Sequence, residues 1–369
     1  MNVAEARLCL LFQSNPEFGD SALAQCLSQA GSPRALAEGG QSLWRELGMG
    51  ASCARLLARA LRAGSHAVDT QLDKLARVDA DVLPITDARY PPLLRTIHDP
   101  PPVLYVRGDA AHLSKPQLAV VGSRSASPAG LRAASMLAGE ACRAGLCITS
   151  GLARGIDGAA HQGALLAQGE SIAVMATGVD QVYPLRHQKL AAELVQHGCL
   201  VSEFPPGTAP LRHNFPRRNR VISGLSLGTL VVEAALPSGS LITARTAMEQ
   251  GREVFALPWS IYHAAGAGCL YLLRDGAKMV QTVADIVEEL GPLFTLQQEL
   301  LPCSDNNPGA KVRLSNRQER VFGLVGYEPV TADELSALCN LPVAQIMVDL
   351  SQLELLGVVT RFAGAYIRS

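Results

Sequence analysis

Two glycine turns in the middle of the chain carry residues suited to hold an anion. The first is Gly122-Ser123-Arg124, which follows an apolar run and precedes a helical stretch. Glycine lets backbone amides approach a phosphate, serine adds a hydroxyl, and arginine adds a forked cation. The second turn, 150–158, places Arg154 in the same context. Neither matches the Gly-x-Gly-x-x-Gly dinucleotide fingerprint, which disfavours hydride-transfer chemistry.

A third stretch adds most of the positive charge. Residues 204–232 hold four arginines but no aspartate or glutamate, a local charge of +4 in a chain of net charge -1. Such guanidiniums repel one another by roughly a few tenths of a kcal/mol per exposed pair, which a phosphate chain between them offsets. The alternative is a solvated surface, which the interleaved Phe215 and Ile222 disfavour. The arginines are Arg212, Arg217, Arg218 and Arg220.

Two acidic residues near these segments have alternative roles. Asp157 is placed to cap the helix that follows the second turn. Glu233 closes an apolar strand, where it would act as a base or form an ion pair with Arg217 or Arg220. The ion pair is the favoured interpretation.

The segments that carry these turns alternate between short apolar runs and alanine-rich helical stretches. Because the runs are apolar throughout, they indicate strands buried on both faces, and the alternation predicts a doubly wound parallel sheet of Rossmann type. In such a sheet the binding site lies beyond the carboxyl ends of the strands. The predicted strands are 118–122, 146–151, 171–178, 199–204, 228–234 and 253–258.

The complete chain is predicted to be an α/β protein in which an extended Rossmann-like sheet carries two smaller domains. The N-terminal one is all-helical and resembles SAM or helix-hairpin-helix domains. The C-terminal one reads as three helices and a hairpin, the pattern of a winged helix. The predicted divisions are a helical domain at 1–80, an ordered proline-rich connector at 81–116, the Rossmann-like domain at 117–292, a linker at 293–312 and the winged helix at 313–369.

Composition limits the partners and the compartment. With 32 basic and 33 acidic side chains, the chain needs a local patch to hold any polyanion. The nine cysteines and eight histidines show no metal-ligand spacing, so no metal or cofactor is expected. The first residues lack a signal-peptide pattern and no apolar run is long enough to span a bilayer, which predicts a cytoplasmic protein without a membrane segment.

Several motifs in a fixed order make the chain resemble the DNA-processing protein A (Smf) family. They are the sequences 88–94 and 99–105, the two glycine turns, the run 215–226 and the Ser238-Gly239-Ser240 step. The resemblance is strong over residues 84–290. It implies a cytoplasmic homodimer that is no enzyme but a recombination mediator of natural transformation, which protects incoming single-stranded DNA and loads RecA.

Carried over position by position, the resemblance implies a DNA site made of both turns, the basic stretch and the serine-glycine step. Phe215 is the only aromatic residue between Arg212 and Arg220, so phosphate contacts should dominate and binding should be independent of sequence and strongly salt-dependent. The implied DNA-binding residues are Gly122, Ser123, Arg124, Arg154, Phe215, Arg217, Arg218, Asn219, Arg220, Ser238 and Gly239.

Two other functions stand as alternatives. Residues 224–233 distantly resemble the Gly-Gly-x-Gly-Thr-x-x-Glu loop of phosphoribohydrolases, which would make Glu233 catalytic in a nucleotide hydrolase. That enzyme would not need the arginine cluster. A transcription regulator acting through the winged helix is disfavoured, because 313–369 holds five basic and six acidic residues and its third helix has no lysine or arginine.

Overall fold

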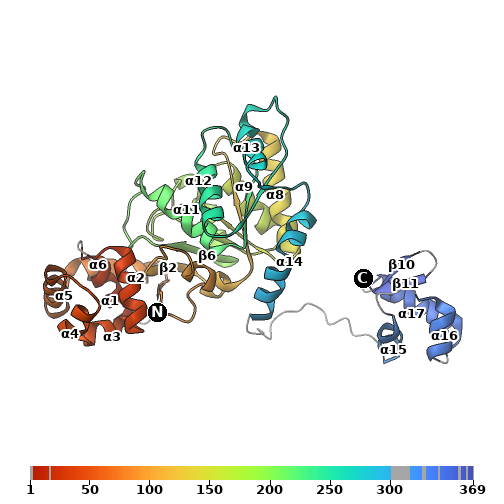
Figure 1. The fold of residues 1–369 in the computed structure, drawn as a ribbon, viewed down its shortest axis with the longest axis horizontal. Coiled ribbons are helices and arrows are strands. Elements are labelled where there is room, and N and C mark those ends of the chain that lie inside the picture. The colour runs from red at the N-terminus through yellow and green to blue at the C-terminus, as the bar shows by residue number, and fades with distance from the viewer. Residues whose placement is uncertain are drawn as a thin grey trace. The chain divides into compact units, whose positions relative to one another are not determined.

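The chain divides into two compact units, Met1–Leu301 and Pro302–Ser369. The computed structural model describes residues 3–15, 18–300, 316–325, 330–339, 341–355, 359–362 and 365–368. Figure 1 shows the helices and strands of both units, which are described separately below.

A nine-stranded sheet forms the centre of the first unit. Its strands are β1 (Ala80–Pro84), β2 (Val103–Gly108), β3 (Gln117–Val121), β4 (Cys147–Ser150), β5 (Ser171–Val174), β6 (Gly198–Ser202), β7 (Gly228–Val231), β8 (Glu253–Ala256) and β9 (Lys278–Met279). Their spatial order is β1-β2-β6-β5-β4-β3-β7-β8-β9. In this spatial order, all neighbouring strands from β6 through β5, β4, β3, β7 and β8 to β9 are parallel. Strand β2 runs antiparallel to both of its neighbours, β6 and β1. The predicted Rossmann-like sheet is confirmed, and each predicted strand overlaps one of β3 to β8.

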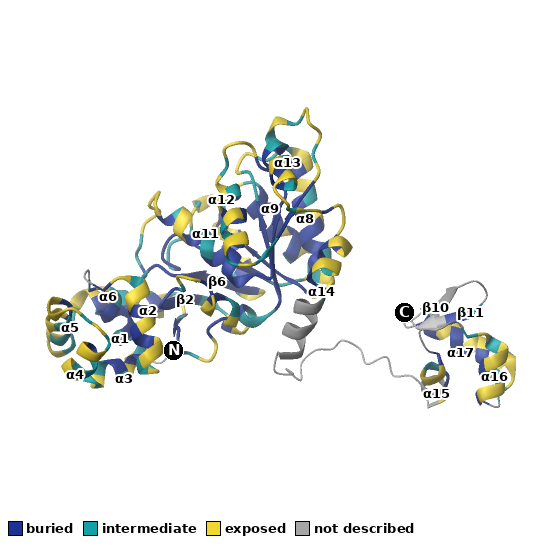
Figure 2. Cartoon of the chain, in the orientation of Figure 1, coloured by how far each residue is buried: buried dark blue, intermediate teal, exposed yellow. Residues whose placement is uncertain are grey.

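Helices cover both faces of this sheet. The helices that follow β2 are α8 (Pro128–Arg143), α9 (Ile156–Leu166), α10 (Gln188–Gln196), α11 (Asn214–Leu225), α12 (Gly239–Glu249), α13 (Ala267–Arg274) and α14 (Val283–Leu300), with short 3-10 helices η1 (Ala110–Ser114), η2 (Leu185–His187) and η3 (Ala264–Gly266). In β3, Leu118 and Val120 pack with α8, α9 and α14, whereas Ala119 and Val121 pack with α11 and α12. Alternate side chains of a strand point to opposite faces, so both faces need apolar residues. Figure 2 shows the resulting layer of buried strands between helices.

The N-terminal helices share their core with the edge of the sheet. They are α1 (Val3–Gln13), α2 (Asp20–Ala30), α3 (Pro33–Glu38), α4 (Gly40–Glu46), α5 (Ala51–Ala63) and α6 (His66–Arg77). Leu10 of α1, Leu75 of α6 and Tyr105 of β2 belong to one buried apolar cluster. The predicted borders at 80 and 116 therefore fall inside the first unit, and the proline-rich segment between them contains β2, η1 and the short helix α7 (Pro92–Arg95).

Helix α14 extends into the segment predicted as a linker. The backbone is helical to Leu300, so residues 293–300 of the predicted linker are helical. Leu293, Leu296 and Leu300 repeat at helical spacing, a signal outweighed in the prediction by the turn residues that follow. Residues 301–312 of the predicted linker lie outside the described residues.

The second unit confirms the predicted winged helix. It consists of α15 (Asn316–Leu324), α16 (Ala332–Cys339), α17 (Val343–Leu355) and the hairpin β10 (Val359–Phe362) to β11 (Ala365–Arg368). Its buried cluster includes Val321, Leu335, Leu350 and Tyr366 and draws only on residues 321–366. The start of the predicted domain, 313–315, lies outside the described residues.

Candidate functional site

The first glycine turn leaves β3 as a hydrogen-bonded loop that presents Arg124 to solvent. Ser123 N donates to Glu233 O at 2.7 Å, and Ser125 N donates to Ser123 Oγ at 3.1 Å. A Cβ on Gly122 would lie 2.8 Å from Glu233 O, so only glycine fits where this loop meets the end of β7. The loop therefore fixes the backbone that carries Arg124.

The second turn lies directly against the first. Ile156 N donates to Ser123 O at 3.1 Å. Gly155 has φ +77°, and a Cβ at this position would lie 2.1 Å from the same oxygen. Glycine is required both for this backbone conformation and for the close approach. The predicted placement of the two turns side by side is confirmed, and it brings Arg124 and Arg154 to one edge of the sheet.

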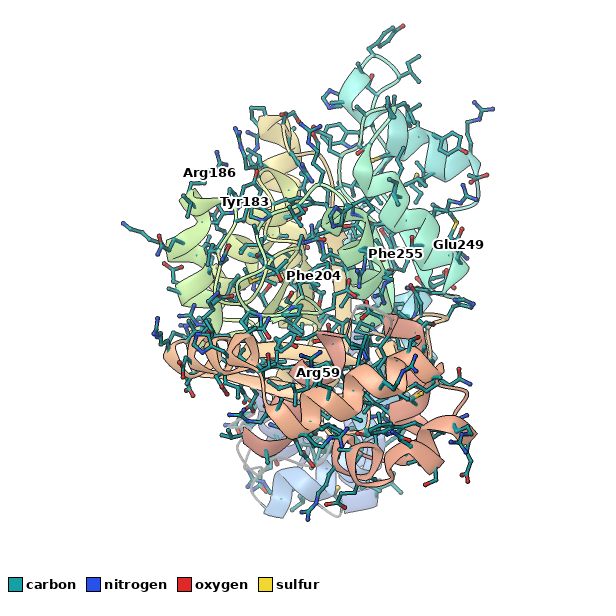
Figure 3. All side chains as sticks on the ribbon, turned by 90° about the vertical axis from the view of Figure 1, so that its left-hand side faces the viewer. Arg59, Tyr183, Arg186, Phe204, Glu249 and Phe255 are labelled. Atoms are coloured by element: carbon teal, nitrogen blue, oxygen red, sulfur yellow. The ribbon has the colours of Figure 1, made fainter. Side chains whose placement is uncertain are left out.

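Four exposed arginines line one hollow of about 620 Å³ at this edge, here named the arginine groove. Arg124 and Arg154 come from the turns, Arg132 from α8 and Arg186 from η2. No aspartate or glutamate is among its described lining residues. Figure 3 labels Arg186 at the upper left, beside Tyr183. The sequence prediction missed Arg132 and Arg186, because both lie outside the basic stretch and the two glycine turns.

A smaller hollow of about 70 Å³ adjoins the arginine groove and adds aromatic rings to it. Arg124 and Arg154 line both hollows, and Tyr183 and Phe215 line the smaller one. The Arg124 guanidinium carbon lies 5.1 Å from the centroid of the Phe215 ring, within cation–π range. Tyr183 packs edge-on against Phe215 with centroids 5.9 Å apart. The predicted residue Phe215 thus lies beside the predicted Arg124, and Tyr183 is an addition that the basic stretch does not reveal.

Arg218 lies beneath the turns and not on the surface. Its residue exposure is 4%, and Nη1 donates to Gly151 O at 2.6 Å and to Val174 O. A Cβ on Gly151 would lie 2.3 Å from Nη1, so this glycine makes room for the guanidinium. Burial lowers the pKa of Arg218 to about 10, although the charge of Asp157 opposes the change. The structure thus gives Arg218 a supporting position under the second turn, in place of the predicted surface position.

Asp157 holds the same turn in place from within. Its Oδ2 accepts from Gly151 N at 3.1 Å and from Ala153 N at 3.3 Å. Burial raises the pKa of Asp157, while Arg218 and the two amides lower it. The carboxylate therefore orders the loop before α9, and the expectation that it caps α9 is wrong.

Arg217 and Arg220 are held in ion pairs by a residue just outside the predicted basic stretch. Glu203 precedes that stretch by one position, and its side chain is 2% exposed. It pairs with Arg217 at 3.1 Å and with Arg220. Arg217 also pairs with Asp20 of α2, and Arg220 Nε lies 3.1 Å from Asp99 Oδ2. The local charge of +4 is therefore largely neutralised, which the prediction overlooked because its count began at residue 204.

Burial raises the pKa of Glu203, whereas the charges of Arg220 and Arg217 lower it. Two guanidiniums on one buried carboxylate supply the compensation that such a group needs. The expected ion pair of Glu233 with these arginines is therefore wrong, because Glu203 takes that place.

Glu233 is enclosed behind the first turn. It has no exposed surface, and it accepts from Ser127 N at 3.0 Å and from the Ser127 hydroxyl. His263 Nε2 lies 3.4 Å from Glu233 Oε2. A Cβ on Gly130 would lie 2.4 Å from the same oxygen. This carboxylate anchors the start of α8 and is enclosed there, which disfavours the catalytic role that the hydrolase alternative gives it.

Of the predicted residues not yet placed, three line neither hollow. Asn219 is half-buried on α11, Ser238 precedes α12 and accepts from Ser240 N at 3.3 Å, and Gly239 is exposed at the first position of α12. None of the three is among the described residues that line the two hollows. Their part in DNA binding stays a prediction.

The described residues include neither a cluster of metal ligands nor a membrane-spanning helix. This part of the chain holds no group of three or more histidine, cysteine, aspartate or glutamate side chains placed to bind a metal ion. None of its helices combines the length and apolar character needed to cross a membrane.

Fold and site together define the class: a Rossmann-like protein with a cationic groove at the carboxyl edge of its sheet and a separate winged-helix unit. Residues 81–291 match the family described as DNA recombination-mediator protein A, and residues 306–365 match the DprA winged helix domain. The chain therefore belongs to the DNA recombination-mediator protein A family.

Named relatives agree with this assignment. The chain is 42% identical to Protein Smf of Escherichia coli K12 over 308 residues, covering 82% of this chain and 80% of the relative. It is 44% identical to DNA processing protein DprA of Bacillus subtilis over 211 residues, covering 57% of this chain and 71% of the relative.

Two solved structures share the fold. DNA processing protein A of Streptococcus pneumoniae superposes with a TM-score of 0.64 at 33% identity, covering 76% of this chain and 96% of that one. DNA processing protein A of Helicobacter pylori, described for its single-stranded DNA binding mode, gives a TM-score of 0.53 at 28% identity and covers 58% of this chain and 97% of that one.

Proposed function

We propose that this protein binds single-stranded DNA in the arginine groove. The observation that carries the proposal is the convergence of Arg124, Arg132, Arg154 and Arg186 on one hollow with no acidic residue among its described lining residues. A forked guanidinium matches the geometry of a phosphate, and four of them suit a chain of phosphates. The Helicobacter pylori relative is described as binding single-stranded DNA.

Binding is proposed to be independent of base sequence. Phosphate contacts carry no sequence information, and a stacking contact on Phe215 accepts any base because every base has a π face. The backbone contacts should make affinity fall steeply with salt, with a logarithmic slope of about -0.7 per phosphate neutralised on a single strand. The enclosed Glu233 supports a binding role and not a hydrolytic one.

The family also supports a proposal for the wider role. We propose a cytoplasmic recombination mediator of natural transformation that protects incoming single strands and loads RecA onto them. Its family is described by the words recombination mediator, and this is the support for the role.

We also propose a homodimer through α12 and α13. These helices border a hollow of about 500 Å³ whose lining includes the exposed apolar side chains of Ile242, Met248 and Tyr271 beside the charged Arg245, Glu249 and Asp275. Contiguous exposed apolar surface marks interaction sites. Light scattering on the wild type and on Tyr271→Asp tests this: the variant should be monomeric, and a dimer that survives unchanged would contradict the surface.

A salt titration tests the DNA proposal. Arg124→Ala and Arg154→Ala should each weaken binding of a thymidine oligomer and reduce the magnitude of the salt slope by about 0.7. Arg143→Ala is the matched control, because Arg143 is an exposed arginine at the far end of α8 and does not line the groove. A wild-type affinity that does not change with salt would refute the proposal, as would wild-type behaviour of both groove variants.

A further inference from the structure

A third hollow continues the path that leads out of the arginine groove. It has a volume of about 590 Å³ and lies beside η2 and the start of α10. Thr177 and Tyr183 line both this hollow and the small aromatic one, just as Arg124 and Arg154 line both the small hollow and the groove. We name it the lateral hollow. Shared lining residues thus link the three hollows one after another, and Tyr183 borders the last two.

The lining of the lateral hollow differs in charge from the arginine groove. It has one cation, Arg107, and one carboxylate, Asp180, whose Oδ1 accepts from Gly207 N at 2.8 Å. The charges balance, so this hollow has no excess of positive charge for a second phosphate. A neutral group fits it better than an anion.

The remaining lining combines apolar surface with amide groups. Leu185 is 77% exposed and Tyr183 is 48% exposed, so both present apolar surface to whatever enters. The side chains of Gln181 and Gln188 add hydrogen-bond donors and acceptors. A planar group with an apolar face and a polar edge matches both features, and an unstacked nucleobase is such a group.

We infer that the lateral hollow receives an unstacked base of the same single strand whose phosphates lie in the arginine groove. The inference rests on the proposed function, because it extends the path of that strand past Tyr183. The groove then supplies phosphate contacts, and the lateral hollow supplies contacts to a base. The two contributions differ in their dependence on salt, since only phosphate contacts release counterions.

The test compares two ligands on full-length protein. One is a thymidine oligomer of about 20 nucleotides, and the other has the same number of phosphates but no bases. Leu185→Ala should bind the thymidine oligomer about fivefold more weakly or worse than the wild type, because truncating this side chain removes apolar contact with the base. It should bind the base-free oligomer like the wild type, with an unchanged salt slope.

Leu166→Ala is the matched control. Leu166 is 81% exposed at the end of α9 and lines a different hollow, so the same truncation there should change neither affinity. Wild-type binding of the thymidine oligomer by Leu185→Ala would overturn the inference and leave the arginine groove standing. So would equal weakening of both oligomers with a smaller salt slope, since that would mean a phosphate contact. If the wild type binds neither oligomer, the proposed function fails and takes this inference with it.

Discussion

The positively charged side chain of Arg218 is buried. Replacing it with methionine removes the donor for Gly151 O and Val174 O and leaves Asp157 without its counter-charge. Breaking a buried charge network of this kind costs about 3–5 kcal/mol. We therefore expect Arg218→Met to lower the free energy of unfolding by that amount in a urea titration.

The control for Arg218 is Arg212→Met, because Arg212 is exposed in the same segment. Surface substitutions of this type usually change stability by less than about 0.5 kcal/mol. If Arg218→Met unfolds like the wild type but no longer binds DNA, the Arg218 guanidinium contacts DNA and does not support the fold.

The burial of His161 makes the free energy of unfolding depend on pH, because the folded protein disfavours a protonated imidazole there. The Ser171 hydroxyl donates to Ile148 O at 2.8 Å, so it accepts from His161 Nδ1–H, 2.7 Å away. Nε2 is then unprotonated, and it is buried without a partner among the described residues. Burial, with the charges of His187 and Arg218, lowers the pKa of His161 to about 3.

The sign of the pH effect follows from this lowered pKa. Below the ordinary value of 6.5 the unfolded chain binds a proton at His161 that the folded chain does not, so this residue makes stability fall as the pH falls. Between pH 7 and pH 5 the loss is about 2 kcal/mol. Urea unfolding at both pH values should show that His161→Gln lacks this part of the loss. An identical loss in both proteins would show that His161 takes up its proton while folded.

At the scale of structural elements, the contact between the two glycine turns leaves no room for a side chain at Gly155. Gly155→Ala forces a side chain into a left-handed conformation that costs about 1–3 kcal/mol, and its Cβ would collide with Ser123 O. We expect a lower melting temperature and weaker binding of single strands, because the turns that carry Arg124 and Arg154 must move apart. Thermal unfolding and a binding titration measure the two effects.

Gly239→Ala is the stability control for this turn. Nothing lies within 4 Å of the position its Cβ would take at the start of α12, so its melting temperature should equal that of the wild type. Wild-type melting and binding by Gly155→Ala would mean that the interlocked turns are not what orients the two arginines.

The central strands were predictable from sequence, and the edges of the sheet were not. Strands β3 to β8 are short apolar runs between glycine turns, a pattern that identifies a doubly covered parallel sheet. By contrast, β1 and β2 flank a proline-rich segment. They pair with each other, and they join the rest of the sheet through the antiparallel contact of β2 with β6. No local pattern encodes that contact.

The candidate site was predictable where its residues lie in turns. Arg124 and Arg154 follow strand ends, whose place in the sheet is known once the strands are assigned. Arg132 and Arg186 reach the groove from a helix and a 3-10 helix, and only the packed structure brings them there. Conversely, the sequence overstated the free positive charge of the arginines at 217–220. Their ion pairs depend on residues that are far away in the sequence, such as Asp20.

For the whole molecule, the two units have separate cores, which predicts separate behaviour. The buried clusters of the first unit include no described residue beyond Leu290, and that of the second includes none before Val321. Helix α17 has no basic residue, and Asp349 on it pairs with Arg317 at 2.6 Å. Helix α17 therefore offers little to a phosphate chain.

Removing 302–369 should consequently leave single-strand binding intact. We expect the remaining chain to match the full-length protein within about twofold in affinity and to keep its salt slope, because all four arginines of the groove are retained. An unchanged melting transition of the first unit would show that the truncation has not damaged the fold. Arg154→Ala should weaken binding equally in both backgrounds, since the effects of independent sites add. A salt slope that shrinks by more than about one on truncation would show instead that the winged helix contacts phosphates itself.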